Sequence, residues 1–391
     1  MNDVVIVSAV RLPIGRFGGS LREVSDWDMG TIVIAEALKR AGLKGDQVDE
    51  VIMAHGFKTG DLPANSARAV AIKAGIPIEI PEFTINKACG GGLRAISLAA
   101  QLIKTGENDI IIAGGMESMS RAAYILPKVR WGSRLGHLQL VDQLVLLDPI
   151  SGYSLGMTGE NVAELYKISR QDQDQFAFLS QQKAEKAIKS NKFREEIVAV
   201  QVSQTGRSSV IFDTDEHPRF GTTLEGLSKL KPAFKENGTI TAGNASGIND
   251  GAAAAVVMSR KKAKEMGISP LVSIRSYASV GVKPEIMGIG PIPATQKALQ
   301  KAKLELKDID LIELNEAFAA QSLAVIRELN MDTEKINVNG GAIALGHPIS
   351  ATGCILLTKI IYEMKRRKSQ FGLVTMCIAG GQGIAMIVEN E

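Results

Sequence analysis

The sequence predicts an α/β fold built from two similar halves. Short apolar runs of strand length alternate with longer segments of helical period, which is typical of sheets covered by helices. One segment near the N-terminus also recurs near the C-terminus, which indicates a duplication. The chain has 391 residues, of which 45% are hydrophobic and 22% charged, enough for two or three domains with a sizeable core.

The elements follow from these runs. The apolar runs predicted as strands are 4–7, 110–113, 271–274, 310–314, 373–377 and 385–388, and the predicted helices are 31–41, 93–104, 295–302 and 317–329. Ser169, three residues before Asp172, predicts the start of a helix over 171–190. A Gly/Asn-rich turn at 243–251 is expected to lead into an Ala-rich helix.

The duplication is visible in two segments. The residues that begin at Ala37 match those that begin at Ala298 without a gap, and Gly92 and Gly353 share the same spacing of 261 positions. We therefore expect residues 1–118 with 246–269 to form one half and residues 270–391 the other. Residues 119–245, which are more polar and irregular, are expected to form an inserted domain.

Charge and cysteine content exclude several classes of protein. A net charge of +3 is too small to indicate nucleic-acid binding, and no apolar run is long enough to span a membrane. Three scattered cysteines and four histidines argue against a disulfide framework and a metal site. The N-terminus reads as a first strand and not as a signal peptide, so a cytoplasmic, reducing location is expected.

Cys89 is the first candidate for chemistry. It stands between a strand-like run and an apolar helix and is followed by three glycines. The N–H groups and partial positive charge of a helix N-terminus favour a thiolate and can lower the thiol pKa. The alternative is a small buried residue in a tight turn.

Three more positions resemble parts of a site. His347 precedes the helix that the repeat pairs with the one after Cys89, so the two could face each other, although it could equally be a loop histidine bonded to backbone. Cys377 ends a strand before a Gly-rich loop and is either a base or a buried thiol. Asn315 lies between a strand and a helix and either positions a water or caps the helix. The remaining cysteine and histidines are expected to be core, structural or exposed residues: Cys354, His55, His137 and His217.

Taken in order, six stretches resemble the thiolase family along nearly the whole chain, and most of all its bacterial acetyl-CoA acetyltransferases. They are NKACGGG, GGMESMS, AGNASGINDGAA, NEAF, NGGAIALGHPISATG and CIAGGQG. The resemblance implies a five-layered αβαβα core with an inserted loop domain.

The resemblance also implies a role for each site residue. Cys89 matches the acyl-accepting nucleophile, His347 the histidine that activates it, Cys377 the second cysteine that moves a proton, and Asn315 the residue that holds an oxyanion-hole water. The backbone N–H groups of Cys89 and Ala379 would form a second oxyanion hole. Coenzyme A would contact positions on and near the inserted domain, namely Leu155, Arg219, Phe234, Ala242, Ser246, Ala317 and Phe318.

Three departures from the family pattern bear on this assignment. Gly91 stands where serine is usual, Ala379 where glycine is frequent, and Ser154-Leu155 where many acetyl-specific members have His-Met. The first two concern the nucleophile turn and the oxyanion hole. The third weakens the expectation of strict acetyl specificity.

The function implied is reversible condensation of two acetyl-CoA to acetoacetyl-CoA and coenzyme A, without a permanently bound cofactor. A degradative 3-ketoacyl-CoA thiolase of fatty-acid β-oxidation is the alternative. A decarboxylating ketoacyl synthase is more remote, since Cys377 and the NEAF stretch speak against it. So is a non-catalytic lipid-binding relative, which would need no nucleophile, whereas here all the catalytic positions are filled. The family forms dimers or tetramers, and the basic stretch 128–137 resembles the loop that pairs dimers.

Overall fold

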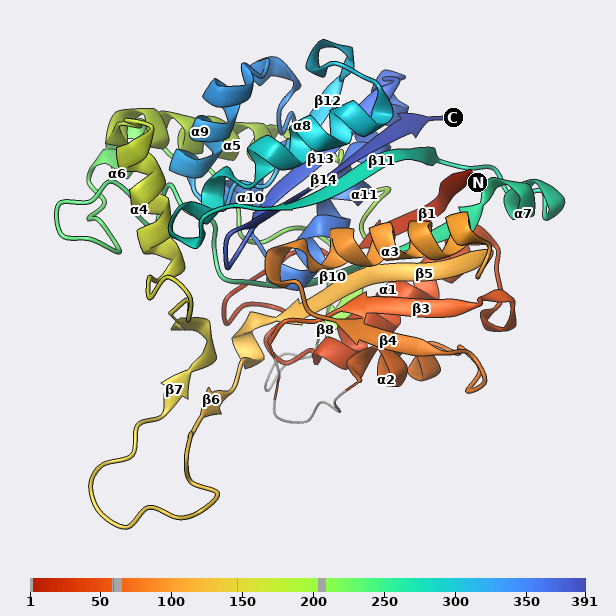
Figure 1. Cartoon of the computed structure of the whole chain (residues 1–391), viewed down its shortest axis with the longest axis horizontal. Helices are drawn as coiled ribbons and strands as arrows, with labels where there is room; N and C mark the ends of the chain where they lie inside the picture. Colours follow the sequence, from red (N-terminus) through yellow and green to blue (C-terminus); the bar gives the residue numbers. More distant parts are fainter. Residues whose placement is uncertain (1–2, 58, 60–64, 146, 203–208) are drawn as a thin grey trace.

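One large mixed sheet organises the molecule (Figure 1). The computed structural model describes residues 3–57, 59, 65–145, 147–202 and 209–391. In spatial order the strands of the sheet are β12 (Leu311–Leu314), β13 (Phe371–Ile378), β14 (Gln382–Asn390), β11 (Val272–Gly281), β1 (Val4–Arg11), β10 (Asn249–Ser259), β5 (Ile110–Ser118), β3 (Glu50–Ala54) and β4 (Glu82–Ile85), with β2 (Gly15–Arg16) paired to β10.

The sheet consists of two halves that repeat one pattern. β10 is antiparallel to β5, which is parallel to β3, and in the same way β14 is antiparallel to β13, which is parallel to β12. The halves meet where β1 pairs with β11 over only two residue pairs. Asp49 accepts backbone N–H groups at the start of β5, and its repeat partner Asp310 does the same for β13. The predicted duplication is therefore confirmed.

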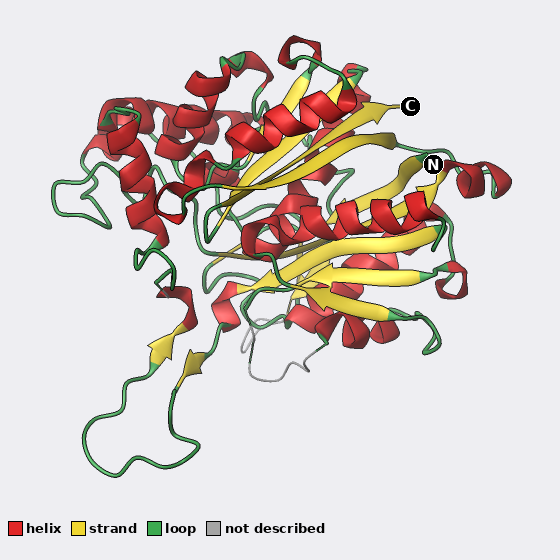
Figure 2. Ribbon diagram, viewed as in Figure 1, coloured by secondary structure: helices red, strands yellow, loops and turns green. Residues whose placement is uncertain are grey.

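Helices cover the outer faces of the two halves and fill the space between them (Figure 2). α1 (Asp26–Ala41) and α2 (Ser66–Lys73) pack on one outer face, and α8 (Pro291–Ala302) and α9 (Ala319–Leu329) on the other. α3 (Gly91–Thr105) and α11 (Ile349–Arg367) lie between the halves. Successive side chains of a strand point to opposite faces of the sheet, so Val5 packs toward α1 and Ile6 toward the central helices. The predicted αβαβα order is confirmed.

The predicted strands and helices are all present, but one further expectation was wrong. The Ala-rich segment after residue 251 is not a helix but the central strand β10. Alanine favours helices, yet here β1 and β5 pair with both edges of the segment. Its small side chains face α1 on one side and α11 on the other, so burial and pairing override the local preference.

The chain between β5 and β10 builds the region predicted as an insertion. It contains β6 (Tyr124–Ile125), β7 (Val141–Asp142), α4 (Leu155–Leu165), α5 (Arg170–Lys189), β8 (Val200–Val202), β9 (Val210–Phe212) and α6 (Leu224–Ser228). β6 pairs with β7 and β8 with β9. The hydroxyl of Ser169 accepts the N–H of Asp172, as its sequence predicted for the start of α5.

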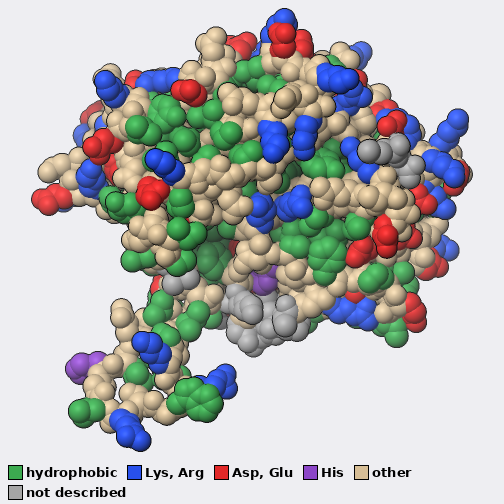
Figure 3. Space-filling view, viewed as in Figure 1, with side chains coloured by type: hydrophobic (Ala, Val, Ile, Leu, Met, Phe, Trp, Pro, Cys, Tyr) green, Lys and Arg blue, Asp and Glu red, His purple; other side chains and the backbone are tan. Residues whose placement is uncertain are grey.

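Residues 126–140, which we call the projection, extend away from the body between β6 and β7 (Figure 1). Hydrophobic and basic side chains share its surface (Figure 3). Trp131 is 91% exposed and Leu135 98% exposed. Large apolar side chains are rarely left this open on a monomer, so the projection has the character of an interaction surface.

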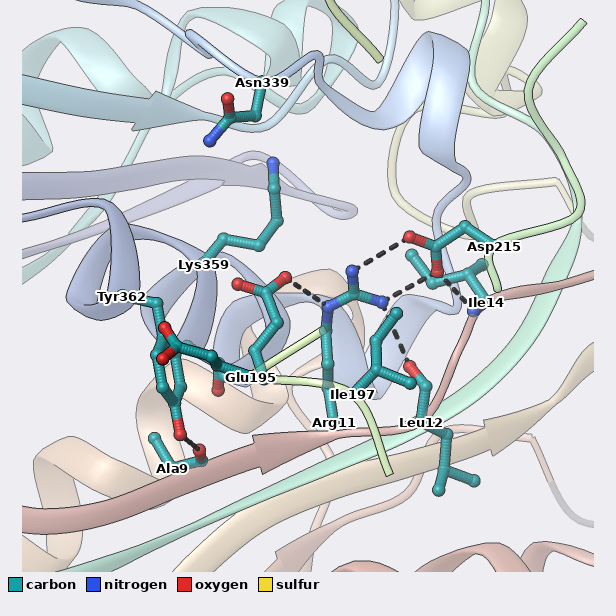
Figure 4. A network of polar contacts seen from close by, with 12 residues as sticks. Ala9, Arg11, Leu12, Ile14, Glu195, Ile197, Asp215, Asn339, Lys359 and Tyr362 are labelled. Carbon is teal, nitrogen blue, oxygen red and sulfur yellow. Dashed lines mark hydrogen bonds and ion pairs between the residues drawn. The ribbon is translucent and has the colours of Figure 1, made fainter. Parts of the chain in front are cut away.

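A buried ionic network ties the intervening region to the sheet (Figure 4). The guanidinium of Arg11, on β1, donates to Asp215 at 2.7 and 2.9 Å and to Glu196 at 2.8 Å. It also lies over the ring of Phe193, 5.1 Å from the ring centre. Because the arginine is fully buried, losing both carboxylates would leave its charge uncompensated, and losing either one would remove a charge-assisted hydrogen bond. No helix among the described residues is long and apolar enough to cross a bilayer.

Candidate active site

Cys89 lies in a tight turn between the end of β13 and the start of α11. A short 3-10 turn, Ala88–Gly90, carries it directly into α3, and Ala88 adopts a φ of 42°. A Cβ at Gly90 would lie 2.4 Å from the side chain of Ile378. A Cβ at Gly92 would lie 2.9 Å from the carbonyl oxygen of Ser350. The glycines after Cys89 therefore allow this turn to approach both segments closely.

The surroundings of the Cys89 sulfur combine stabilising donors with deep burial. The backbone N–H groups of Ala379 and of Cys89 itself face the sulfur and favour the thiolate. Burial acts against them, together with the carboxylate of Glu117, and raises the pKa of Cys89 to about 11. The expectation that the helix terminus lowers this pKa was wrong, because loss of solvent outweighs the nearby donors.

Hydrogen bonds fix both the backbone and the ring of His347. Its backbone N–H donates to Asn249 Oδ1 at 2.9 Å, and its ring Nδ1 lies 2.7 Å from the hydroxyl of Thr352. Burial lowers the pKa of His347 to about 4, so the ring is neutral near neutral pH. A neutral, oriented imidazole with Nε2 left for other contacts can accept a proton or donate a hydrogen bond.

Cys377 is the last but one residue of β13 and lies near Cys89. Burial raises the pKa of Cys377, and so does the proximity of Cys89. Its neighbours include Met287, Ala317 and Phe318, which form a separate apolar cluster. The two cysteines therefore meet at a boundary between the central core and this smaller cluster.

Asn315 follows β12 and does not cap a helix. The N-terminal cap of α9 is Phe318, so the capping interpretation of Asn315 is excluded. Asn315 is fully buried, and within the described part of the chain neither its Oδ1 nor its Nδ2 has a hydrogen-bond partner. A buried amide without protein partners is suited to hold a ligand group or a water.

A cleft of about 850 Å³ runs along the intervening region. Four of the seven residues predicted to contact coenzyme A line it: Arg219, Phe234, Ala242 and Ser246. The other three, Leu155, Ala317 and Phe318, belong to the apolar cluster around Cys377. The two groups join where the rings of Phe234 and Phe318 meet edge to face, with centroids 6.3 Å apart.

Sequence reasoning missed several residues of this region. Asn249 and Thr352 hydrogen-bond to His347, and Glu117 accepts the backbone N–H of Ser350, although all three occur in the stretches that carry the resemblance. Met287 lies outside every quoted stretch and carries no sequence signal that we can name. His217, expected to be structural or exposed, is half-buried and lines the cleft. His55 is buried against Asp26, His137 is exposed and Cys354 is fully buried.

Comparison with protein families and with known proteins gives matches that cover nearly the whole chain. The family model "Thiolase, N-terminal domain" matches residues 4–261, and "Thiolase, C-terminal domain" matches residues 268–390. The chain belongs to the thiolase family. It is 54% identical to an acetyl-CoA acetyltransferase of Syntrophomonas wolfei subsp. wolfei, with 99% of each chain covered.

Solved thiolase structures superpose on the chain with little deviation. The acetyl-CoA acetyltransferase of Bacillus anthracis matches with a TM-score of 0.98 at 46% identity, covering 100% of this chain and 99% of that one. Human mitochondrial 3-ketoacyl-CoA thiolase also matches with a TM-score of 0.98, at 41% identity and the same coverage.

The structure accommodates the departures of this thiolase from the family pattern. A Cβ at Gly91 would lie 2.7 Å from the Cβ of Ala54, so a serine at this position would require a shift. Ala379 is not among the residues with positive φ, so alanine keeps the donor without strain. Ser154 caps α4 through the N–H of Met157.

Proposed function

We propose that the protein is an acetyl-CoA C-acetyltransferase that works through an acetyl group on Cys89. The observation that carries this proposal is the environment of the Cys89 sulfur. Two backbone N–H groups face it, and a second cysteine lies beside it. The acetyl-CoA acetyltransferase names of the similar proteins support the acetyl substrate.

In the first step, neutral His347 takes the proton of the Cys89 thiol as the sulfur attacks the thioester carbon of acetyl-CoA. The N–H groups of Cys89 and Ala379 stabilise the negative charge that develops on the thioester oxygen. The carbon–sulfur bond to coenzyme A breaks, and the coenzyme A thiolate takes the proton back from His347. Acetyl-Cys89 and coenzyme A remain.

In the second step, Cys377 passes its thiol proton to neutral His347 and regains it when the step is complete. The Cys377 thiolate formed in this way removes an α-proton from a second acetyl-CoA. His347 Nε2 and a water held by the unpartnered amide of Asn315 stabilise the enolate oxygen. The enolate carbon attacks the acetyl group, the bond to Cys89 breaks, and Cys377 returns a proton to the departing sulfur. The products are acetoacetyl-CoA and free enzyme, and the reverse direction is thiolysis.

Coenzyme A, as substrate and product, would occupy the cleft with Arg219 near its phosphates and Phe234 and Ser246 along its pantetheine arm. The acyl group would reach Cys377 past Leu155, Ala317 and Phe318. No resident cofactor is needed for this chemistry. We further propose a cytoplasmic homo-oligomer, a dimer or a tetramer, in which the projection contributes to pairing.

Chain length tests the proposal against its main alternative. We expect kcat/KM for thiolysis to be highest with the four-carbon 3-ketoacyl-CoA and to fall across six, eight and ten carbons. Leu155 has a bulk similar to methionine, and one methylene in an apolar pocket changes the barrier by about 1–3 kcal/mol, so some six-carbon activity is expected. A maximum at eight or ten carbons would instead favour a degradative 3-ketoacyl-CoA thiolase.

A further inference from the structure

The side chain of Glu316 is buried at the junction of the two segments that carry Asn315 and His347. It is 1% exposed and accepts hydrogen bonds from three donors. These are Ser180 Oγ at 2.7 Å, Asn337 Nδ2 at 2.7 Å and the backbone N–H of Ile343 at 3.1 Å. They come from α5, from the loop after the 3-10 turn Thr333–Lys335, and from the short helix α10 (Ala342–Leu345).

The segment that leads to His347 is folded tightly around this carboxylate. A Cβ at Gly341 would lie 2.1 to 2.5 Å from the carboxylate atoms of Glu316, so only glycine fits there. The N–H of Gly341 donates to Ser180 Oγ at 3.1 Å, so the hydroxyl links the carboxylate to the glycine. α10 then runs from Ala342 to Leu345, two residues before His347.

The same carboxylate also secures the strand end that precedes Asn315. Asn337 donates through Nδ2 both to Glu316 and to the carbonyl oxygen of Leu314, and its Oδ1 accepts the N–H of Leu314 at 2.9 Å. The side chain of Asn337 is therefore fixed between Glu316 and β12. A shift of Asn337 would move the backbone at Leu314 and with it the amide of Asn315.

We infer that Glu316 is a positioning residue of the reaction, because its carboxylate fixes the segments that carry Asn315 and His347 in one arrangement. Burial raises the pKa of Glu316, whereas its three partners each donate a hydrogen bond and so favour the ionised carboxylate, which accepts on both oxygens. Supporting groups of this kind usually change activity by about 10–100-fold when they are altered. The inference rests on the proposed function, since Glu316 matters for the reaction only if Asn315 and His347 have the roles proposed for them.

Glu316→Gln tests the inference with almost no change in size. One of its terminal atoms becomes an NH2 group and must face a donor, either Asn337 or the pair Ser180 and Ile343. We expect kcat to fall about 10–100-fold while the KM for acetyl-CoA changes by less than about 2-fold, since Glu316 does not line the cleft. Both Cys89 acetylation and exchange of the α-protons should slow, because the segments of His347 and Asn315 both depend on it.

Glu196→Gln is the matched control. Glu196 is a fully buried carboxylate that bonds Arg11 and not the segment before His347. We expect its variant to lose stability but to keep kcat per folded enzyme. If Glu316→Gln behaves in the same way, with kcat unchanged per folded enzyme, the residue is merely structural and the inference fails.

Ser180→Ala keeps the test decisive if Glu316→Gln does not fold. It removes one donor to Glu316 and the link to Gly341 without introducing a clash. We expect kcat to fall about 2–10-fold with KM unchanged, and an unchanged kcat would overturn the inference. Failure of the wild-type enzyme to acetylate Cys89 would refute the proposed function instead, so the two failures are distinguishable.

Discussion

Cys89 and His347 are both buried, and burial moves their pKa values in opposite directions. It raises the pKa of the thiol to about 11 and lowers that of the imidazole to about 4. Near neutral pH both groups are therefore uncharged, and the thiolate forms only as His347 takes the proton. The sequence identified both residues from their turns and glycines, but it could not reveal that desolvation outweighs the helix terminus at Cys89.

Stability should fall in acid because His347 is buried neutral. The unfolded chain binds a proton on this ring below about pH 6.5, whereas the folded protein does so only below about pH 4. The stability contributed by the neutral ring is complete above about pH 6.5 and is lost as pH falls toward about 4, by up to about 3 kcal/mol.

The test compares denaturant unfolding of the wild type and His347→Asn between about pH 7 and pH 4.5. The variant should lose less free energy of unfolding on acidification than the wild type. His137→Asn, at an exposed histidine, serves as the control and should follow the wild type. Parallel curves for wild type and His347→Asn would contradict the assignment of a neutral buried ring.

The helices α3 and α11 cross where the repeat places its paired glycines. A Cβ at Gly92 would lie 3.0 Å from the backbone N of Cys354, and a Cβ at Gly353 would lie 2.5 Å from the backbone N of Leu93. Because the obstacles are backbone atoms, Gly92→Ala must separate the helices, and we expect it to lower the free energy of unfolding by about 1–3 kcal/mol.

Gly281→Ala is the matched substitution in open space. Among the described residues, the only contact that a Cβ there would make within 4 Å is at 3.9 Å, to the carbonyl oxygen of Gly381. Chemical unfolding should show this variant within about 0.5 kcal/mol of the wild type. Equal losses at Gly92 and Gly281 would show that the helix crossing does not explain why Gly92 and Gly353 recur at matching positions of the repeat.

At the element scale, the sequence correctly predicted the strands and helices whose conformation depends on the local pattern of apolar residues. The strands and helices with clear periodicity were correct, and the repeat predicted the two halves. The Ala-rich strand β10 was missed because its conformation depends on β1 and β5, which pair with it from distant parts of the chain. The partners of Asn249 and Glu316 are long-range contacts of the same kind.

At the scale of the whole molecule, the cleft and the apolar cluster around Cys377 form where the intervening region meets both halves. The residues predicted to bind coenzyme A divide between them, four in the cleft and three in the cluster. Family resemblance selected these positions, whereas residue patterns alone would not have brought Phe234 against Phe318. Met287 and His217 were missed for that reason.

The projection should determine how many copies associate. Its apolar side chains, among them Trp131 and Leu135, are open on a single copy, and burying them against another copy would be favourable. We expect replacement of residues 127–139 by a short Gly-Ser linker to reduce the mass in solution to that of a smaller assembly, measured by light scattering. Acetylation of Cys89 should continue, and an unchanged mass would contradict this role.

The most direct test of the central claim is to locate the acetyl group. Wild type, Cys89→Ala and Cys377→Ala are each incubated with acetyl-CoA, digested and examined by mass spectrometry, and exchange of the α-protons of acetyl-CoA is followed in parallel. We predict acetyl on Cys89 in the wild type and in Cys377→Ala, none in Cys89→Ala, and a loss of α-proton exchange of about 10²–10⁴-fold in Cys377→Ala. Acetyl on Cys377 or Cys354 in the wild type, or undiminished exchange in Cys377→Ala, would contradict the account.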